Sequence, residues 1–209
     1  MNKPNKKSYA VNTGKYGIIV LAAGNSTRLG RDKQTLLVQG ETLLKRASKT
    51  AVAAQPDQVV VVLGEKAHLH QRELHGLEVS IVINSDSSEG IASSIRTGIR
   101  HLQSLDQDID YALIMLCDQP YVTSGHLKAI IDRQHETKAR IVASRYQKRA
   151  GVPVLFHKRF FSSLLKLKGD SGAKQFLLEA EDLITVELLN GEVDIDTMED
   201  YLRLQISNS

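Results

Sequence analysis

The chain has 209 residues, a net charge of +3, one cysteine and no tryptophan. Its composition, 42% hydrophobic and 24% charged, is that of a soluble globular protein with a sizeable core, which excludes disorder as the default. One cysteine excludes an internal disulfide and a cysteine-cluster zinc site, and no apolar run approaches the roughly 20 residues that span a bilayer. We therefore expect a cytoplasmic protein that acts without a membrane, and the small net charge gives no indication of nucleic-acid binding.

The first part of the chain, residues 1–15, is polar and basic and lacks the apolar stretch of a secretory signal, so it predicts a flexible tail. From residue 16 onward, apolar runs alternate with segments of helical periodicity. The runs are nearly continuous, as expected for strands that helices cover on both faces. In chain order the predicted strands are 16–21, 59–63, 79–83, 111–116 and 140–144, and the predicted helices between them are 42–54, 67–75, 89–105 and 124–135.

The pattern after Gly151 is mixed. The predicted elements there are a strand at 152–156, helices at 158–167 and 172–180, a strand at 184–188 and a final helix from Thr197. The alternation of strands and helices predicts an α/β fold, a Rossmann-like three-layer αβα sandwich with a mostly parallel sheet, in which residues 16–209 form a single domain. Ligands of open parallel sheets bind outside the carboxyl ends of the strands, so the site is expected there.

Charge is distributed unevenly along the chain. Residues 1–49 hold ten Lys/Arg and two Asp/Glu, whereas residues 170–209 hold two Lys/Arg and ten Asp/Glu. Such a separation is typical either of an anion site paired with a cation site or of solvated surfaces.

The first predicted strand runs directly into Leu-Ala-Ala-Gly-Asn-Ser-Thr-Arg-Leu-Gly over residues 21–30, and Lys33 follows. Small residues let a ligand approach the backbone closely, and successive N–H groups in such a turn bind anions. Arg28 offers a planar fork for phosphate and Lys33 a compact point charge. The alternative is an ordinary turn with two surface cations. The sequence has neither a Walker A loop nor a Gly-x-Gly-x-x-Gly motif.

The fourth predicted strand ends in Met-Leu-Cys-Asp-Gln-Pro over residues 115–120. Asp118 is well placed there to hold Mg²⁺, which proteins bind through one or two carboxylates plus substrate phosphates. The alternative is that Asp118 caps the next helix, although that helix begins six residues later, near Ser124. Cys117 is expected to be a small buried residue and not a nucleophile.

The acidic segment near the carboxyl terminus offers a second metal ligand. Asp196 or Thr197 could cap the last helix, with Glu199 and Asp200 in its first turn, where negative charge is favourable. Asp196, which alternates with Asp194 along a short extended segment, is then available to a metal ion.

Together these motifs resemble the MobA-like nucleotidyltransferases, most closely the branch of molybdenum cofactor cytidylyltransferases. Similar motifs follow in the same order at residues 89–95 (Glu-Gly-Ile-Ala-Ser-Ser-Ile), 151–156 (Gly-Val-Pro-Val-Leu-Phe) and 169–174 (Gly-Asp-Ser-Gly-Ala-Lys). The resemblance covers residues 16–203. It implies a fold of the nucleotide-diphospho-sugar transferase type and a Mg²⁺-dependent transfer of CMP, or another NMP, from an NTP to the phosphate of molybdopterin, with release of pyrophosphate.

The resemblance also implies a role for each matching position. The nucleotide would be bound by Leu21, Ala22, Ala23, Gly24, Arg28, Lys33, Gly64 and Asn84. The catalytic residues would be Arg28, Lys33 and Asp118, and Mg²⁺ would be held by Asp118 and Asp196. The acceptor would face Ser93, Ser94, Asp170 and Gly172. The resemblance also implies that alanine at position 23 favours CTP over GTP as the nucleotide.

Three hypotheses remain open at this point. The first is a cytidylyltransferase that acts on molybdopterin. The second is a related transferase that uses GTP, or another acceptor such as a sugar phosphate or the cofactor of a purine-pathway metalloenzyme. The third is a non-catalytic, nucleotide-binding maturation factor that serves a molybdoenzyme. A molybdoenzyme or its chaperone is expected as a protein partner. The presence of Lys33, Asp118 and Asp196 together disfavours an inert binder.

Overall fold

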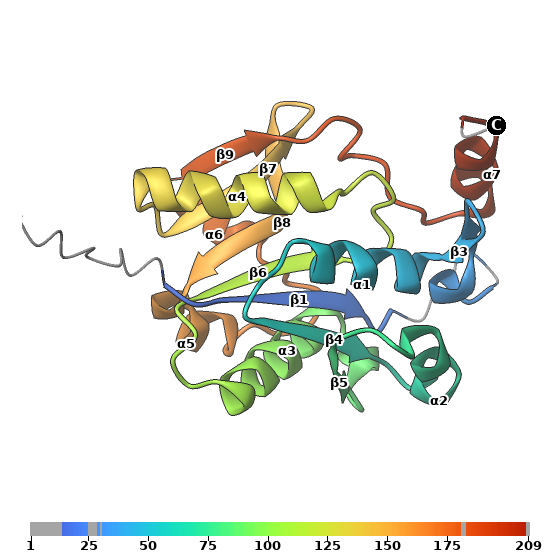
Figure 1. Cartoon of the computed structure of the whole chain (residues 1–209), viewed down its shortest axis with the longest axis horizontal. Helices are drawn as coiled ribbons and strands as arrows, with labels where there is room; N and C mark the ends of the chain where they lie inside the picture. Colours follow the sequence, from blue (N-terminus) through green and yellow to red (C-terminus); the bar gives the residue numbers. More distant parts are fainter. Residues whose placement is uncertain (1–13, 25–28, 30, 181–182, 208–209) are drawn as a thin grey trace, which may run out of the picture.

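The computed structural model of the chain describes residues 14–24, 29, 31–180 and 183–207 (Figure 1). The strands are β1 (Tyr16–Ala22), β2 (Leu37–Val38), β3 (Glu41–Thr42), β4 (Gln58–Leu63), β5 (Ser80–Ile83), β6 (Tyr111–Leu116), β7 (Ile141–Tyr146), β8 (Arg149–His157) and β9 (Leu183–Glu187). The α-helices are α1 (Leu43–Ala53), α2 (Ala67–His70), α3 (Ile91–Leu105), α4 (Ser124–Thr137), α5 (Phe161–Leu164), α6 (Lys174–Glu179) and α7 (Met198–Ser207). Short 3₁₀ helices are η1 (Lys33–Thr35), η2 (Gln71–Leu74), η3 (Ser87–Glu89) and η4 (Lys158–Phe160).

Seven strands form one sheet in the order β5-β4-β1-β6-β8-β7-β9, and β2 and β3 form a separate ribbon. The neighbouring pairs β5-β4, β4-β1, β1-β6 and β7-β9 are parallel, and only β8 runs against its two neighbours. The reversal follows from a two-residue hairpin between β7 and β8, in which Gln147 and Lys148 both have positive φ, the conformation that a tight hairpin turn requires. The prediction of a mostly parallel sheet is confirmed.

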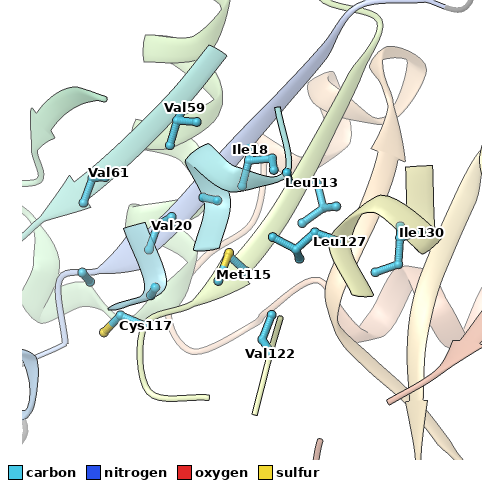
Figure 2. Close-up of a cluster of buried hydrophobic side chains, with 14 of the residues drawn as sticks. Ile18, Val20, Val59, Val61, Leu113, Met115, Cys117, Val122, Leu127 and Ile130 are labelled. Atoms are coloured by element: carbon cyan, nitrogen blue, oxygen red, sulfur yellow. The ribbon is translucent and has the colours of Figure 1, made fainter. Parts of the chain in front are cut away.

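Each face of the sheet carries its own buried core. Along β1, Ile18 and Val20 face a cluster that includes residues of α1 and α4, whereas Ile19 and Leu21 face a cluster built with α3, α5 and α6. Figure 2 shows the first of these cores, with Ile18 of β1 and Leu127 of α4 among its members. In Figure 1, α1 and α3 lie on opposite sides of β1. The predicted three-layer sandwich is therefore confirmed.

Two predicted helices differ from the structure in their hydrogen-bond pattern. The segment 67–75 consists of α2 followed by η2, and the segment 158–167 consists of η4 followed by α5. Apolar periodicity predicts that a segment is helical, but it does not distinguish α from 3₁₀ hydrogen bonds, and tight 3₁₀ turns are frequent in short connecting helices. The remaining predicted elements are present with boundaries that differ by a few residues.

The predicted tail lies outside the described residues except for Gly14 and Lys15. Lys15 donates from its backbone N–H to Asp110 Oδ2 at 3.1 Å and from Nζ to Asp106 Oδ2 at 2.8 Å, so it is joined to the turn before β6. In the described part of the chain, no helix is both long enough and apolar enough to cross a membrane.

Candidate active site

A cavity of about 480 Å³ lies at the carboxyl ends of β1 and β6, where the topology of the sheet predicts a ligand site. Its walls come from the loop after β1, from η1, from η3 with the start of α3, and from the end of β6. Most of the predicted site residues in the described part of the chain line this cavity. They are Leu21, Ala22, Ala23, Gly24, Lys33, Ser94, Asp118 and Asp170.

Three charged side chains from distant parts of the chain meet at one end of the site. Lys33 Nζ donates to Asp118 Oδ2 at 2.8 Å and to Asp196 Oδ1 at 2.7 Å, and only 12% of the lysine side chain is exposed. Burial acts to lower the pKa of Lys33, but the two carboxylates outweigh it and hold that pKa above its ordinary value. Lys33 is therefore a fully charged ammonium at neutral pH, in a partly desolvated position where its charge acts strongly.

The start of α7 explains how Asp196 reaches this cluster. Thr197 Oγ1 accepts from the backbone N–H of Asp200 at 3.2 Å, and Asp200 Oδ2 accepts from the backbone N–H of Thr197 at 2.8 Å. This reciprocal cap accounts for Thr197 and Asp200, so Asp196 is not needed for capping. Fully buried Ile195 anchors the same segment, because its N–H donates to Asp118 O at 3.2 Å.

The carboxylates of the cluster fit a divalent cation. Asp118 Oδ1 is buried and has no hydrogen-bond partner among the described residues, although such atoms are normally satisfied. Burial, followed by the charges of Asp118 and Asp196, raises the pKa of Asp194 to about 6, so a further negative charge is unfavourable at this point. No group of three or more His, Cys, Asp or Glu that could hold a metal occurs within the described residues. Two carboxylates nevertheless suffice for Mg²⁺ when substrate phosphates complete its shell.

Gln34 is a site residue that the sequence reasoning missed. It is 3% exposed, lines the cavity, and donates from Nε2 to Ala22 O at 2.9 Å and to Gly24 O at 2.8 Å. Carbonyl oxygens can only accept, so the amide nitrogen must face them and both of its N–H groups are used. Gln34 thereby fixes the backbone of the small-residue loop. A glutamine after a lysine carries no sequence signal for such a role.

Gly64 also lies against this loop. A Cβ atom at this position would be 2.7 Å from Ala23 O, so only glycine permits the observed approach of the two backbones. Gly64 is not among the described residues that line the cavity, and its observed contact is with the loop itself. Arg28, the other predicted phosphate ligand of this loop, lies outside the described residues.

Other predicted residues lie behind the cavity wall. Asn84 is 2% exposed and donates from Nδ2 to the hydroxyl oxygens of Ser93 and Ser94, at 2.8 and 3.0 Å. Of these three residues, only Ser94 lines the cavity. Gly172 packs near the side chain of Ile91, which also lines it. Cys117 is buried, and burial raises the pKa of its thiol, so the thiolate needed for nucleophilic attack is disfavoured at neutral pH.

Comparison with known proteins identifies the family. Residues 18–183 match the family described as the MobA-like NTP transferase domain. The chain is 30% identical to the purine catabolism protein PucB of Bacillus subtilis, with 88% of this chain and 92% of PucB covered. It is 28% identical to a probable molybdenum cofactor guanylyltransferase of Bacillus cytotoxicus, with 89% and 94% covered. It is 24% identical to the molybdenum cofactor cytidylyltransferase of Escherichia coli, with 88% and 92% covered.

Solved structures agree with this assignment. The crystal structure of Rv0371c from Mycobacterium tuberculosis in complex with manganese superposes with a TM-score of 0.76 at 27% identity, and covers 92% of this chain and 99% of that protein. The family match over residues 18–183 includes every described residue that lines the cavity, with Lys33 and Asp118 among them, and ends before Asp196. The chain thus belongs to the MobA-like NTP transferase family and is a nucleotidyltransferase.

Proposed function

We propose that the protein transfers CMP from CTP to the terminal phosphate of molybdopterin, releases pyrophosphate and depends on Mg²⁺. The observation that carries the proposal is the meeting of Lys33, Asp118 and Asp196 beside a cavity at the strand ends. The lysine there supplies positive charge for the triphosphate, and the two carboxylates supply negative charge for the metal ion. The metal fits because hard oxygen donors lie together and Asp118 Oδ1 has no hydrogen-bond partner among the described residues.

In this proposal different groups of residues bind the nucleotide, the triphosphate, the metal ion and the acceptor. The loop 21–24 binds the nucleotide through its backbone, and Lys33 with Arg28 binds the triphosphate. Gly64 and Asn84 support the nucleotide side. Asp118 and Asp196 hold Mg²⁺, which supplies positive charge against the phosphates when bound. The acceptor faces Ser93, Ser94, Asp170 and Gly172.

The chemical step requires little from the protein beyond position and charge. An oxygen of the acceptor phosphate attacks the α-phosphorus of CTP, the bond from that phosphorus to the bridging oxygen breaks, and pyrophosphate leaves with the electron pair. The attacking phosphate is already ionised, so no general base is needed. Lys33 neutralises charge near the phosphates, and a cation about 4 Å from a phosphate contributes about 4 kcal/mol at an effective dielectric near 20.

The choice of CTP rests on alanine at position 23, which lines the cavity. The named relatives include a probable guanylyltransferase and a cytidylyltransferase at similar identities, 28% and 24%, so they support nucleotidyl transfer without separating the two nucleotides. A second candidate is transfer to the cofactor of a purine-catabolic enzyme. The 30% identity with PucB supports that candidate.

Pyrophosphate release tests the proposal. The protein is incubated with Mg²⁺ and CTP, GTP or ATP, with and without molybdopterin. We expect release only with CTP and molybdopterin together. Release with GTP and molybdopterin would indicate guanylyl transfer instead. Tight nucleotide binding without release under any condition would contradict catalysis and support the maturation-factor hypothesis. Lys49→Ala serves as the control variant, because its exposed ion pair with Glu41 lies outside the cavity.

A further inference from the structure

An arginine and a glutamate outside the predicted site form a paired contact at the start of α3. Arg96 Nη1 donates to Glu89 Oε1 at 2.8 Å and Nη2 donates to Glu89 Oε2 at 2.5 Å. Two parallel hydrogen bonds between a guanidinium and a carboxylate fix both the distance and the orientation of the two groups. Arg96 is well covered for a charged residue, with 15% of its side chain exposed.

The same two side chains also bind a segment that is distant in sequence. Arg96 Nη1 donates to Leu167 O at 2.7 Å, and the backbone N–H of Gly169 donates to Glu89 Oε1 at 3.1 Å. The pair therefore bonds to both ends of the short stretch 167–169 that follows α5. An ordinary pair on the surface of one helix would make no such contacts, and its contribution to stability would be small.

Backbone contacts continue this attachment into the cavity wall. The N–H of Ala92, in the first turn of α3, donates to Gly169 O at 3.1 Å. Gly90 has a φ of +120°, and a Cβ atom there would lie 2.6 Å from Gly169 O, so the two backbones touch. Next in the chain is Asp170, which lines the cavity beside Gly90 and Ile91. Its carboxylate lies at the amino-terminal end of a 15-residue helix, where negative charge is favourable.

We propose that Arg96 and Glu89 are positioning residues that hold Gly169 and Asp170 against the start of α3 and so form the acceptor side of the cavity. The part concerning the acceptor rests on the proposed function. Neither residue lines the cavity, so both act through the turn that they hold. The nucleotide side, built on the loop after β1 and on Lys33, is independent of this contact.

The test compares Arg96→Ala and Arg96→Lys with the wild type. Lysine keeps the charge but cannot bind Glu89 and Leu167 O through a planar fork. Arg133→Ala is the matched control, because it removes an exposed arginine–glutamate pair, with Glu136, from α4. Two quantities are measured on the full-length protein. They are the hydrogen-exchange rate of the segment 168–173 and the KM values for CTP and for molybdopterin.

We expect both Arg96 variants to exchange the segment 168–173 about tenfold faster or more, since each loses charge-assisted hydrogen bonds. The KM for molybdopterin should rise about tenfold, the KM for CTP should stay within about twofold, and Arg133→Ala should change neither. Unchanged exchange, or an equal rise in both KM values, would overturn the proposal. If the wild type binds CTP but transfers nothing to molybdopterin, the proposed function fails, and the exchange rates alone decide whether the pair holds the turn.

Discussion

Lys33 is the residue on which the electrostatics of the site depend. Its ammonium pairs with two carboxylates that are far apart in the sequence, and in the proposed reaction its four-carbon stem would let it turn towards the triphosphate. An ammonium in such a partly desolvated position is a strong stabiliser of developing phosphate charge.

Replacement of Lys33 by alanine should therefore reduce kcat by about 10²–10³, the loss typical of one charge contact in the transition state. Pyrophosphate release measures the effect. Lys49→Ala, which removes only an exposed pair with Glu41, should retain the wild-type rate. A Lys33→Ala variant with wild-type kcat would remove Lys33 from the catalytic machinery.

Asp118 is expected to carry the metal dependence. Asp118→Asn keeps the size of the side chain and removes its charge, so activity at any Mg²⁺ concentration should fall by at least about 10². Thermal unfolding should be close to that of the wild type, because the lost ion pair with Lys33, which Asp196 still binds, is offset by weaker repulsion between Asp194 and its neighbouring carboxylates. Activity and melting temperature, measured over a range of Mg²⁺ concentrations, check both points. Normal Mg²⁺-dependent turnover in this variant would exclude the metal role.

At the scale of elements, the cap of α7 positions Asp196. Asp200→Ala removes the acceptor of the Thr197 N–H and should lower the free energy of unfolding by about 1 kcal/mol, the usual worth of a helix cap. Activity should fall as well, because the segment that carries Asp196 loses its anchor. Glu199→Ala is the control in the same helical turn, since its pair with Arg203 is exposed on both sides. Equal effects of the two variants on stability and activity would contradict a specific role for the cap.

The Glu89–Arg96 pair should make the free energy of unfolding depend on pH. The hydrogen bond from Arg96, followed by the Gly169 N–H, lowers the pKa of Glu89 from 4.5 to about 2. A depressed carboxylate pKa stabilises the folded state above the ordinary value, and this contribution is lost as the pH falls towards the folded-state pKa. The stability difference between the wild type and Glu89→Gln should therefore be larger at about pH 5.5 than at about pH 3, as measured by urea unfolding. A difference that does not change with pH would contradict the pairing.

Most helices and strands of the main sheet could be predicted from the sequence, because the spacing of apolar residues follows from which face of each element is buried. The hairpin direction of β8 could not be predicted that way, because it depends on positive φ at Gln147 and Lys148, residues without a strong turn signature. No local sequence pattern predicts the contact of Gly169 with Glu89, because the two residues are 80 positions apart.

At the scale of the whole molecule, the described residues between 29 and 38 pack against the carboxyl-terminal segment 195–204. Leu29, Leu36 and Val38 form a small buried cluster with Ile195 and Leu204. Tyr201 Oη donates to Leu37 O at 2.8 Å, which joins α7 to the β2–β3 ribbon, and Figure 1 shows α7 beside β3. One charge from the basic segment and one from the acidic segment therefore meet beside the cavity, where Lys33 pairs with Asp196.

Only a few of those charges lie at or beside the cavity, and their motifs had singled them out as candidate site residues. Lys33, Asp118 and Asp196 were predicted one by one as phosphate and metal ligands, and the structure brings them within hydrogen-bond distance. Their pairing with one another was not predicted, because it needs the docking of the carboxyl-terminal segment through Ile195. Gln34 was missed for a related reason. Its role depends on backbone carbonyls that come together only in the fold.

The most direct test of the account is to identify the product. The wild type and Asp118→Asn are incubated with CTP, Mg²⁺ and molybdopterin, and pyrophosphate and the mass of the pterin are measured together. For the wild type we predict that pyrophosphate appears in equal amount with a pterin that has gained CMP, and that the variant forms neither. A pterin of unchanged mass in the presence of bound CTP would contradict cytidylyl transfer at this site.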